Sequence, residues 1–179
     1  DLCLMKQNSK ICSKLASASA MPSNNGVIEK WCQANSDANC ITYGGLYHWD
    51  EAMQYSTSVG AQGICPNGWH IPTDEQQHIL DSFLTDSGNT CNASRDGGWE
   101  CANAGTKLKS GGSSNFEGLF AGYRNPENTF SRLGEAAVFW SSSQNGTSAV
   151  ERNIFYSNAT VGRYFDPKAN GFSVRCLKD

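Results

Sequence analysis

The clearest hydrophobic pattern in the chain is that of a helix. Its apolar residues recur at the three- and four-residue spacing that places side chains on one helix face: Ile79, Leu80, Phe83 and Leu84. Thr73 is suited to cap the first turn, and Gln76 stands where a capping box needs it. Asp74 and Glu75 favour the positive helix end, and residues 86–88 (DSG) supply a stop. The pattern predicts an amphipathic helix between Thr73 and this stop.

A second, shorter helical pattern lies nearer the N-terminus. Trp49, Ala52 and Met53 recur at helical spacing, which predicts a short helix from about Asp50 to Tyr55. Residues 2–5 (LCLM) have the composition of a short strand.

The second half of the chain is dominated by short apolar segments separated by Gly, Ser and Asn. The predicted strands are residues 118–123, 137–142, 153–156, 160–164 and 171–177. In the last of these, Phe172, Val174 and Cys176 alternate with Ser173, Arg175 and Leu177, as in a half-buried strand. Two helices followed by strands indicate an α+β fold.

Composition excludes some classes of function. The chain has 179 residues, 39% apolar and 17% charged, and a net charge of −3. No basic cluster points to nucleic acid, and no apolar run is long enough to span a bilayer. The chain starts at Asp1 without a signal-peptide pattern, so we expect a mature or trimmed fragment whose export signal or anchor lay upstream.

The even number of cysteines suggests a disulfide framework in an exported, extracytoplasmic protein. They are Cys3, Cys12, Cys32, Cys40, Cys65, Cys91, Cys101 and Cys176. None forms the close pair that a zinc site needs. Of the 105 connectivities that eight cysteines allow, the spacing suggests Cys3/Cys12, Cys32/Cys40 and Cys91/Cys101, which leaves Cys65/Cys176. The long Cys65/Cys176 bridge would stabilise the folded state by about 4–5 kcal/mol in the chain-entropy model.

Several ordered segments together resemble one family. They are WC at 31–32, NC at 39–40, YGGLYHWDEAM at 43–53, CPNGWHIPT at 65–73, TKLKS at 106–110, AGYR at 121–124, FWSS at 139–142 and GFSVRC at 171–176. In this order they resemble the Fibrobacter succinogenes major paralogous domain, a family of exported bacterial modules. The resemblance runs from about Trp31 to the C-terminus, and the insertion between Cys91 and Cys101 is a local elaboration.

The resemblance implies a C-type-lectin-like fold, akin to that of the formylglycine-generating enzymes. Two short helices would flank small antiparallel sheets, and the N- and C-terminal strands would lie together. Residues 31–179 would form the ligand-binding domain, and residues 1–30 an N-terminal extension or first strand. Some members are diversified by retroelements in the stretch before the final Gly-Phe-Ser-Val-Arg strand, so the resemblance implies a kind of domain that includes such variable proteins.

The matching stretch here supplies the candidate ligand-binding residues, because aromatic and polar side chains dominate adaptable binding surfaces. They are Val150, Glu151, Asn153, Phe155, Tyr156, Ser157, Asn158, Tyr164, Phe165, Asp166 and Pro167, with Trp99 in the Cys91/Cys101 loop. The turn at residues 124–130 is expected to lie nearby.

Other chemistries find little support in the sequence. The acidic and amide signatures of calcium-dependent sugar binding are absent, and residues 125–128 (NPEN) are interpreted as a turn. An oxidase would need two reactive cysteines, whereas Cys176 is required for a bridge. His48, His70 and His78 are interpreted as structural. We expect no catalytic residues, no metal and no cofactor.

These observations predict a non-enzymatic ligand-recognition domain, an adhesin or receptor-binding module that is secreted or displayed on a cell surface, pilus or virion. Its partner would be a protein or glycan on another surface. Nucleic acid is not expected, and the membrane would be reached only through an upstream anchor. The alternative is a minor pilin or filament subunit, with an apolar helix upstream. A formylglycine-generating-enzyme-like oxidase ranks third.

Overall fold

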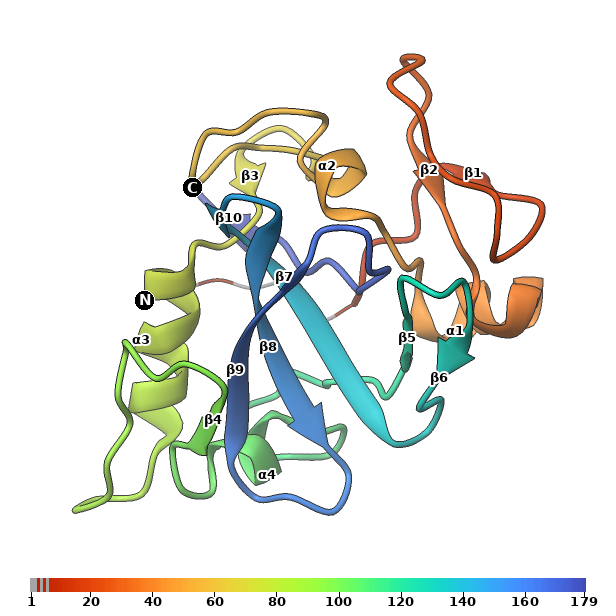
Figure 1. The fold of residues 1–179 in the computed structure, drawn as a ribbon. Helices are drawn as coiled ribbons and strands as arrows, with labels where there is room; N and C mark the ends of the chain where they lie inside the picture. Colours follow the sequence, from red (N-terminus) through yellow and green to blue (C-terminus); the bar gives the residue numbers. More distant parts are fainter. Residues whose placement is uncertain (1–2, 4, 6) are drawn as a thin grey trace.

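The computed structural model describes residues 3, 5 and 7–179 and confirms an α+β fold (Figure 1). The helices of the described residues are η1 (Gln33–Asn35), α1 (Asp37–Tyr43), α2 (Trp49–Ala52), α3 (Asp74–Leu84) and α4 (Ala104–Leu108). The strands are β1 (Ser13–Lys14), β2 (Glu29–Lys30), β3 (Trp69–His70), β4 (Gly98–Glu100), β5 (Tyr123–Arg124), β6 (Phe130–Ser131), β7 (Ala136–Asn145), β8 (Ser148–Phe155), β9 (Val161–Pro167) and β10 (Leu177–Lys178).

An antiparallel sheet with the strand order β4-β9-β8-β7 forms the centre of the molecule (Figure 1). Strands β7 and β8 form a hairpin, which turns through Gly146 at a positive φ of 60°. The predicted strands at 137–142, 153–156 and 160–164 lie almost entirely within β7, β8 and β9. They are longer than predicted: β7 and β9 continue into partly exposed residues, whereas β8 begins earlier, with residues 149–152 buried.

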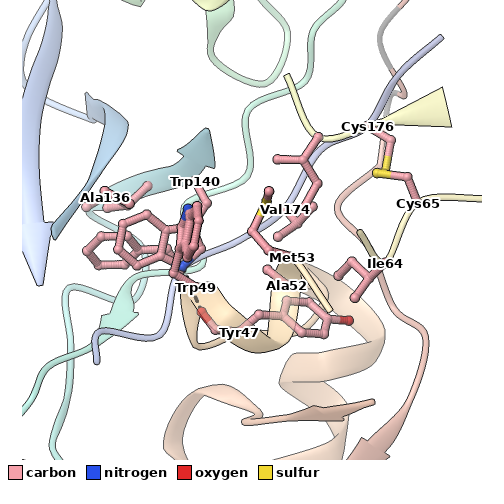
Figure 2. Close-up of a cluster of buried hydrophobic side chains, with 14 residues drawn as sticks. Tyr47, Trp49, Ala52, Met53, Ile64, Cys65, Ala136, Trp140, Val174 and Cys176 are labelled. Carbon is pink, nitrogen blue, oxygen red and sulfur yellow. Dashed lines mark hydrogen bonds between the residues drawn. A yellow bond between two sulfur atoms is a disulfide. The ribbon is translucent and has the colours of Figure 1, made fainter. Parts of the chain in front are cut away.

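Both faces of this sheet are partly covered. One face packs against α3 and α4 through a cluster of apolar residues: Leu84, Leu108, Ala137, Phe139, Ile154 and Val161. The other face packs against α2 and the C-terminal segment in a second cluster, shown in Figure 2. There, Trp140 Nε1 donates to the Tyr47 carbonyl at 2.8 Å, and Trp49 Nε1 donates to the Ser141 carbonyl at 2.8 Å. Each buried indole therefore has a partner for its polar group.

Helix α3 begins as predicted, and its capping box between Thr73 and Gln76 is present. The predicted apolar face is partly wrong. Ile79 is 48% exposed and Phe83 is 83% exposed, whereas the polar residue Asp81 is buried. The helix is rotated because Asp81 lies against two arginines, Arg95 and Arg152, and these ion pairs decide which face turns inward.

The other predicted elements differ from the structure in their extent. Helix α2 is shorter than the predicted helix, because Gln54 and Tyr55 have positive φ angles of 50° and 59°. Of residues 118–123, only Tyr123 belongs to a strand. The prediction of a half-buried strand at 171–177 is wrong, because Ser173 and Arg175 are buried as well. Neighbouring segments cover this stretch on both sides.

The N-terminal residues lie along the C-terminal segment. The Lys178 amide donates to the Cys3 carbonyl, the Met5 amide to the Cys176 carbonyl, and the Ser9 amide to the Val174 carbonyl. Leu2 and Leu4 of the predicted first strand lie outside the described residues. Further along, Leu15 is buried in one cluster with Trp31, Leu46 and Ala121. The division of the chain at residue 31 stays a prediction.

Three of the four predicted disulfides are present: Cys32–Cys40, Cys65–Cys176 and Cys91–Cys101. The Cys3/Cys12 pairing is wrong, since both cysteines are unpaired. The backbone bonds place Cys3 beside Lys178, whereas Ser9 lies beside Val174 and Ser13 beside Ile28, so the two cysteines are held in different parts of the fold. Disulfides need Cα atoms within about 7 Å of each other.

The disulfides also indicate the cellular compartment in which the chain is found. Bonds of this kind persist outside the reducing cytoplasm, so the chain is extracytoplasmic. Among the described residues, no helix combines the length and apolar character needed to cross a bilayer.

Candidate functional site

Aromatic rings gather on the β4–β9 edge of the central sheet, beyond the cluster of Figure 2. Trp99 of β4 lies 5.8 Å from the ring of Phe155 and 6.4 Å from the ring of Tyr164, both edge to face. Trp99 is paired in register with Gly162 of β9. A Cβ atom on Gly162 would lie 3.2 Å from the Trp99 ring and 3.0 Å from the Tyr164 ring, so the glycine makes room for both. The rings are half-buried, with one side supported by the sheet.

A cavity of about 310 Å³ adjoins these rings on the same face. It is lined by Tyr123, Arg132, Val138, Asn153, Phe155, Asp166, Asn170 and Phe172. The lining comes from the three long strands, the β5–β6 hairpin and the segment after β9. The cavity therefore exists only when parts of the chain that are far apart in sequence come together.

Glu151 lies between two residues that line this cavity. Side chains alternate along a strand, so Glu151 and Asn153 of β8 project to the same face. Across the ladder, Glu151 is paired with Tyr164, next but one to Asp166 on β9. The Glu151 side chain is 0% exposed, and in the described structure neither carboxylate oxygen has a hydrogen-bond partner. The Oδ1 atom of Asn153 is also buried without a partner.

The electrostatics of this face favour neutral carboxyl groups. Burial raises the pKa of Glu151 well above its usual value, and the charge of Asp166 raises it further, against the opposing effect of nearby arginines. Burial also raises the pKa of Asp166. Both acids therefore hold their protons more tightly than acids in water.

The reverse side of the same strands carries an ion-pair network with α3. Asp81 Oδ2 accepts from Arg95 Nη2 at 3.0 Å and from Arg152 Nε at 2.7 Å. Asp74 lies 2.8 Å from Arg152 Nη1 and 2.7 Å from Arg163 Nη2. Burial works to raise the pKa of Asp74, but the bonds and charges of Arg163 and Arg152 more than offset it and hold that pKa below its usual value. The network holds β8 and β9 in place on the face of the sheet opposite to the cavity.

The structure brings together only part of the predicted site. Trp99, Asn153, Phe155, Tyr164 and Asp166 share one face around the cavity. Glu151 projects to this face as well but is buried beneath it. The other predicted residues lie elsewhere: Val150 is buried on the reverse face, Tyr156, Ser157 and Asn158 follow the end of β8, Phe165 is on the reverse face against Arg163, and Pro167 is exposed at the end of β9.

The sequence did not point to several lining residues. Tyr123, Arg132, Asn170 and Phe172 have no motif that marks them as binding residues, although the turn at 124–130 was expected nearby. Arg124 itself is fully buried, and its Nη1 donates to the Ala169 carbonyl at 2.8 Å. It thereby supports the segment that contributes Asn170 to the cavity.

The comparison with known proteins identifies the family. A family model, the Fibrobacter succinogenes major domain, matches residues 5–178. The chain belongs to this family. The match begins well before Trp31 and includes most of the N-terminal segment. No curated protein and no solved structure matches the chain.

The histidines of this Fibrobacter succinogenes major domain all make local contacts. His48 Nδ1 accepts from the Asp50 amide at the start of α2. His70 Nδ1 lies 2.6 Å from the Asp179 carboxylate, and its Nε2 lies 2.9 Å from Gln76 Oε1. His78 Nε2 lies 3.2 Å from the Ser82 hydroxyl. Among residues 3, 5 and 7–179, no group of three or more His, Cys, Asp or Glu side chains is arranged to hold a metal ion.

The unpaired cysteines of the domain do not resemble a reactive pair. Burial raises the pKa of the Cys12 thiol to about 12, with smaller opposing effects from Lys30 and Tyr47. Reactive cysteines need a lowered pKa. Cys3 is exposed, and Cys176 is held in its bridge to Cys65. The arrangement around Trp99 and the cavity is therefore the best-supported candidate site, and it offers ring faces and hydrogen-bond acceptors.

Proposed function

We propose that this domain is a non-enzymatic recognition module that binds a ligand outside the cytoplasm. The binding surface, which we call the recognition face, consists of Trp99, Asn153, Phe155, Tyr164 and Asp166. The ligand is a protein or glycan on another surface. The filament-subunit alternative depends on an upstream apolar helix and stays a prediction.

The observation that carries this proposal is the half-buried aromatic group beside a cavity on a supported sheet. Aromatic side chains supply large contact areas at a low entropic cost, and they dominate binding energy in many interfaces. Trp99, Phe155 and Tyr164 stand on strands rather than on mobile loops, and the ion pairs of Asp74 and Asp81 brace those strands. Rigid support of this kind reduces the entropy lost on binding.

We further propose that the fold is C-type-lectin-like and that the stretch from Val150 to Lys168 is open to diversification by a retroelement. The support is the sequence resemblance, together with the antiparallel pairing of the N-terminal and C-terminal segments. The neighbouring DNA tests the second point. A reverse transcriptase gene and a near-copy of the 3′ coding end are expected if the domain is diversified.

The recognition face can be tested with glycan and peptide arrays. The purified domain should give reproducible hits, and Trp99→Ala and Tyr164→Ala should each weaken the measured affinity for a hit at least tenfold, about 1.4 kcal/mol. The loss follows from the removal of aromatic contact area.

Phe83→Ala is the matched control, because Phe83 is an aromatic residue on α3, 83% exposed and on the reverse side of the sheet. It should leave array binding unchanged. Array hits that survive both recognition-face substitutions, or that are lost equally in the control, would show that the ligand binds elsewhere.

A further inference from the structure

Beneath the recognition face lie buried hydrogen-bond acceptors that have no donor. Three atoms are involved: Glu151 Oε1, Glu151 Oε2 and Asn153 Oδ1. In the part of the chain that the structure describes, none of the three accepts a hydrogen bond. Asp166, at the cavity wall, accepts no bond and forms no ion pair with any described side chain either. Folded proteins satisfy the great majority of buried polar atoms, so this group needs an explanation.

These side chains converge on the cavity. Asn153 and Asp166 line it directly, and strand alternation places Glu151 on the same face between them. The ring of Phe172, another lining residue, lies 4.3 Å from the ring of Trp140, the register partner of Glu151 on β7. The Glu151 carboxylate thus lies beneath the cavity floor, with the wall residues Asn153 and Asp166 on either side of it.

Among the described residues, no lysine or arginine side chain forms a hydrogen bond or ion pair with these acceptors. Arg132 lines the cavity, but its Nη1 is 2.7 Å from Glu135 Oε2, and its guanidinium lies over the Phe155 ring. Arg152 and Arg163 project to the reverse face, where they bind Asp74 and Asp81. An unpaired buried carboxylate is costly, and a donor of opposite charge compensates it best.

We propose that this cavity, the acceptor pocket, takes a donor-only organic cation from the ligand, in the simplest case the ammonium group of a lysine side chain of a protein partner. Asp166 would accept its hydrogen bonds at the cavity wall. The bound cation would favour the ionised form of Glu151, which would then add a negative charge from beneath. Phe155, Phe172 and Tyr123 line the walls, and aromatic rings attract ammonium groups and cover aliphatic stems. The proposal rests on the proposed recognition function and names the ligand chemistry of the same site.

Two other ligands fit the pocket less well. A divalent metal ion prefers several oxygen ligands together, and the described residues hold no group of three acidic, Cys or His side chains suited to one. A sugar hydroxyl both donates and accepts. In their ionised forms the carboxylates of Asp166 and Glu151 only accept, so a group that only donates and carries a positive charge matches them better.

The test is a titration followed by ¹H–¹⁵N NMR, with Nα-acetyl-lysine methylamide as the probe. Its uncharged analogue Nα-acetyl-norleucine methylamide and methyl α-glucoside serve as comparison probes. The lysine probe should shift the amide signals of Asn153, Asp166 and Asn170 in a saturable way, with a Kd on the order of 1 mM. The norleucine probe should cause no saturable shift.

Two variants test whether the acidic side chains carry the binding of the lysine probe. Asp166→Asn removes the charge without changing shape and should weaken the lysine probe at least tenfold, as should Glu151→Gln. Glu75→Gln on the exposed side of α3 is the matched control and should bind as the wild type does. If Glu151→Gln loses its dispersed spectrum, Asp166→Asn alone decides, because Asp166 is only half-buried.

Equal binding of the lysine and norleucine probes, or no saturable shift from the lysine probe, would overturn the cation proposal. Saturable shifts of the same amides by the glucoside alone would overturn it too and would make the pocket a glycan site. In both cases the recognition function is judged separately by the arrays. It stands if Trp99→Ala abolishes their hits, and it fails if that substitution has no effect.

Discussion

The buried acid Glu151 carries a free-energy cost for the fold, which the proposed cation would relieve on binding. Its neighbours on β8, Val150 and Arg152, face the α3 side, where apolar contacts and ion pairs satisfy them. Glu151 faces the other side, with both carboxylate oxygens buried and unpartnered within the described structure. Its raised pKa follows first from burial and then from the charge of Asp166. The folded state therefore favours the protonated form.

This raised pKa predicts a pH-dependent stability effect. Stability from the neutral form is fully present below the ordinary glutamate pKa and is lost as the pH rises through the higher folded-state pKa. Glu151→Gln should accordingly stabilise the domain at pH 8 by about 1–3 kcal/mol, or about 2–4 °C in Tm for each kcal/mol. The gain should vanish near pH 4. Thermal unfolding followed by circular dichroism across this range measures it.

Glu75→Gln should leave Tm unchanged within about 1 °C at every pH, because surface changes have small effects. A benefit of Glu151→Gln that grows as the pH falls would contradict the burial of an ionisable acid at this position.

At the scale of elements, α3 and the β8–β9 pair act as one unit. The helix has few apolar contacts with the sheet beyond Leu80 and Leu84, and two buried acids take over part of the packing. Asp81 holds Arg95 and Arg152, while Asp74 holds Arg152 and Arg163. This arrangement fixes the strands whose opposite side carries the recognition face. It also explains why Phe83 points to solvent on a helix whose sequence predicts it to be buried.

The network can be tested by removing one acid. Asp81→Ala leaves the buried Arg95 guanidinium without its carboxylate partner and removes one of the two carboxylates that bind Arg152, so it should cost about 3–5 kcal/mol of unfolding free energy. Phe83→Ala, on the same helix, should cost less than about 0.5 kcal/mol despite the loss of a large apolar side chain. Urea unfolding measures both. Equal costs for the two variants would mean that the apolar face, and not the ion pairs, anchors α3.

At the scale of the whole molecule, the disulfides differ in what they hold together. The Cys65–Cys176 bridge spans 111 residues and joins the segment before β3 to the C-terminal segment, at the edge of the cluster in Figure 2. The Cys91–Cys101 bridge spans 10 residues and closes the loop that carries Trp99. The first therefore constrains the whole fold, and the second constrains one part of the recognition face.

Loop-closure entropy predicts different losses for the two bridges. Replacing both Cys65 and Cys176 by Ser should lower the unfolding free energy by about 5 kcal/mol, and replacing both Cys91 and Cys101 by about 3 kcal/mol. Urea unfolding compares the two double variants. The variant without the Cys91–Cys101 disulfide should also bind an array ligand more weakly, because Trp99 lies in the loop that this disulfide closes. Full affinity in that variant would show that the loop keeps its binding conformation without the disulfide.

The sequence by itself determined the features that depend on neighbouring residues. The capping box at Thr73 and Gln76 was readable because a helix start needs particular side chains three residues apart. The strands β7, β8 and β9 were located because short apolar segments between Gly, Ser and Asn residues are a local pattern, and three disulfide pairs followed from spacing. The family was also identified from ordered motifs, and the matching family model extends that assignment to residues 5–178.

Only the tertiary structure decided which side chains meet. Phe165 and Asp166 are adjacent in sequence, yet β9 sends them to opposite faces, and its register with β8 places Asp166 near Glu151 and Asn153. The lining by Tyr123, Arg132 and Phe172 depends on segments that reach the cavity from elsewhere in the chain. Alternation tells which residues share a face but not which face is covered, because coverage is set by long-range packing and ion pairs.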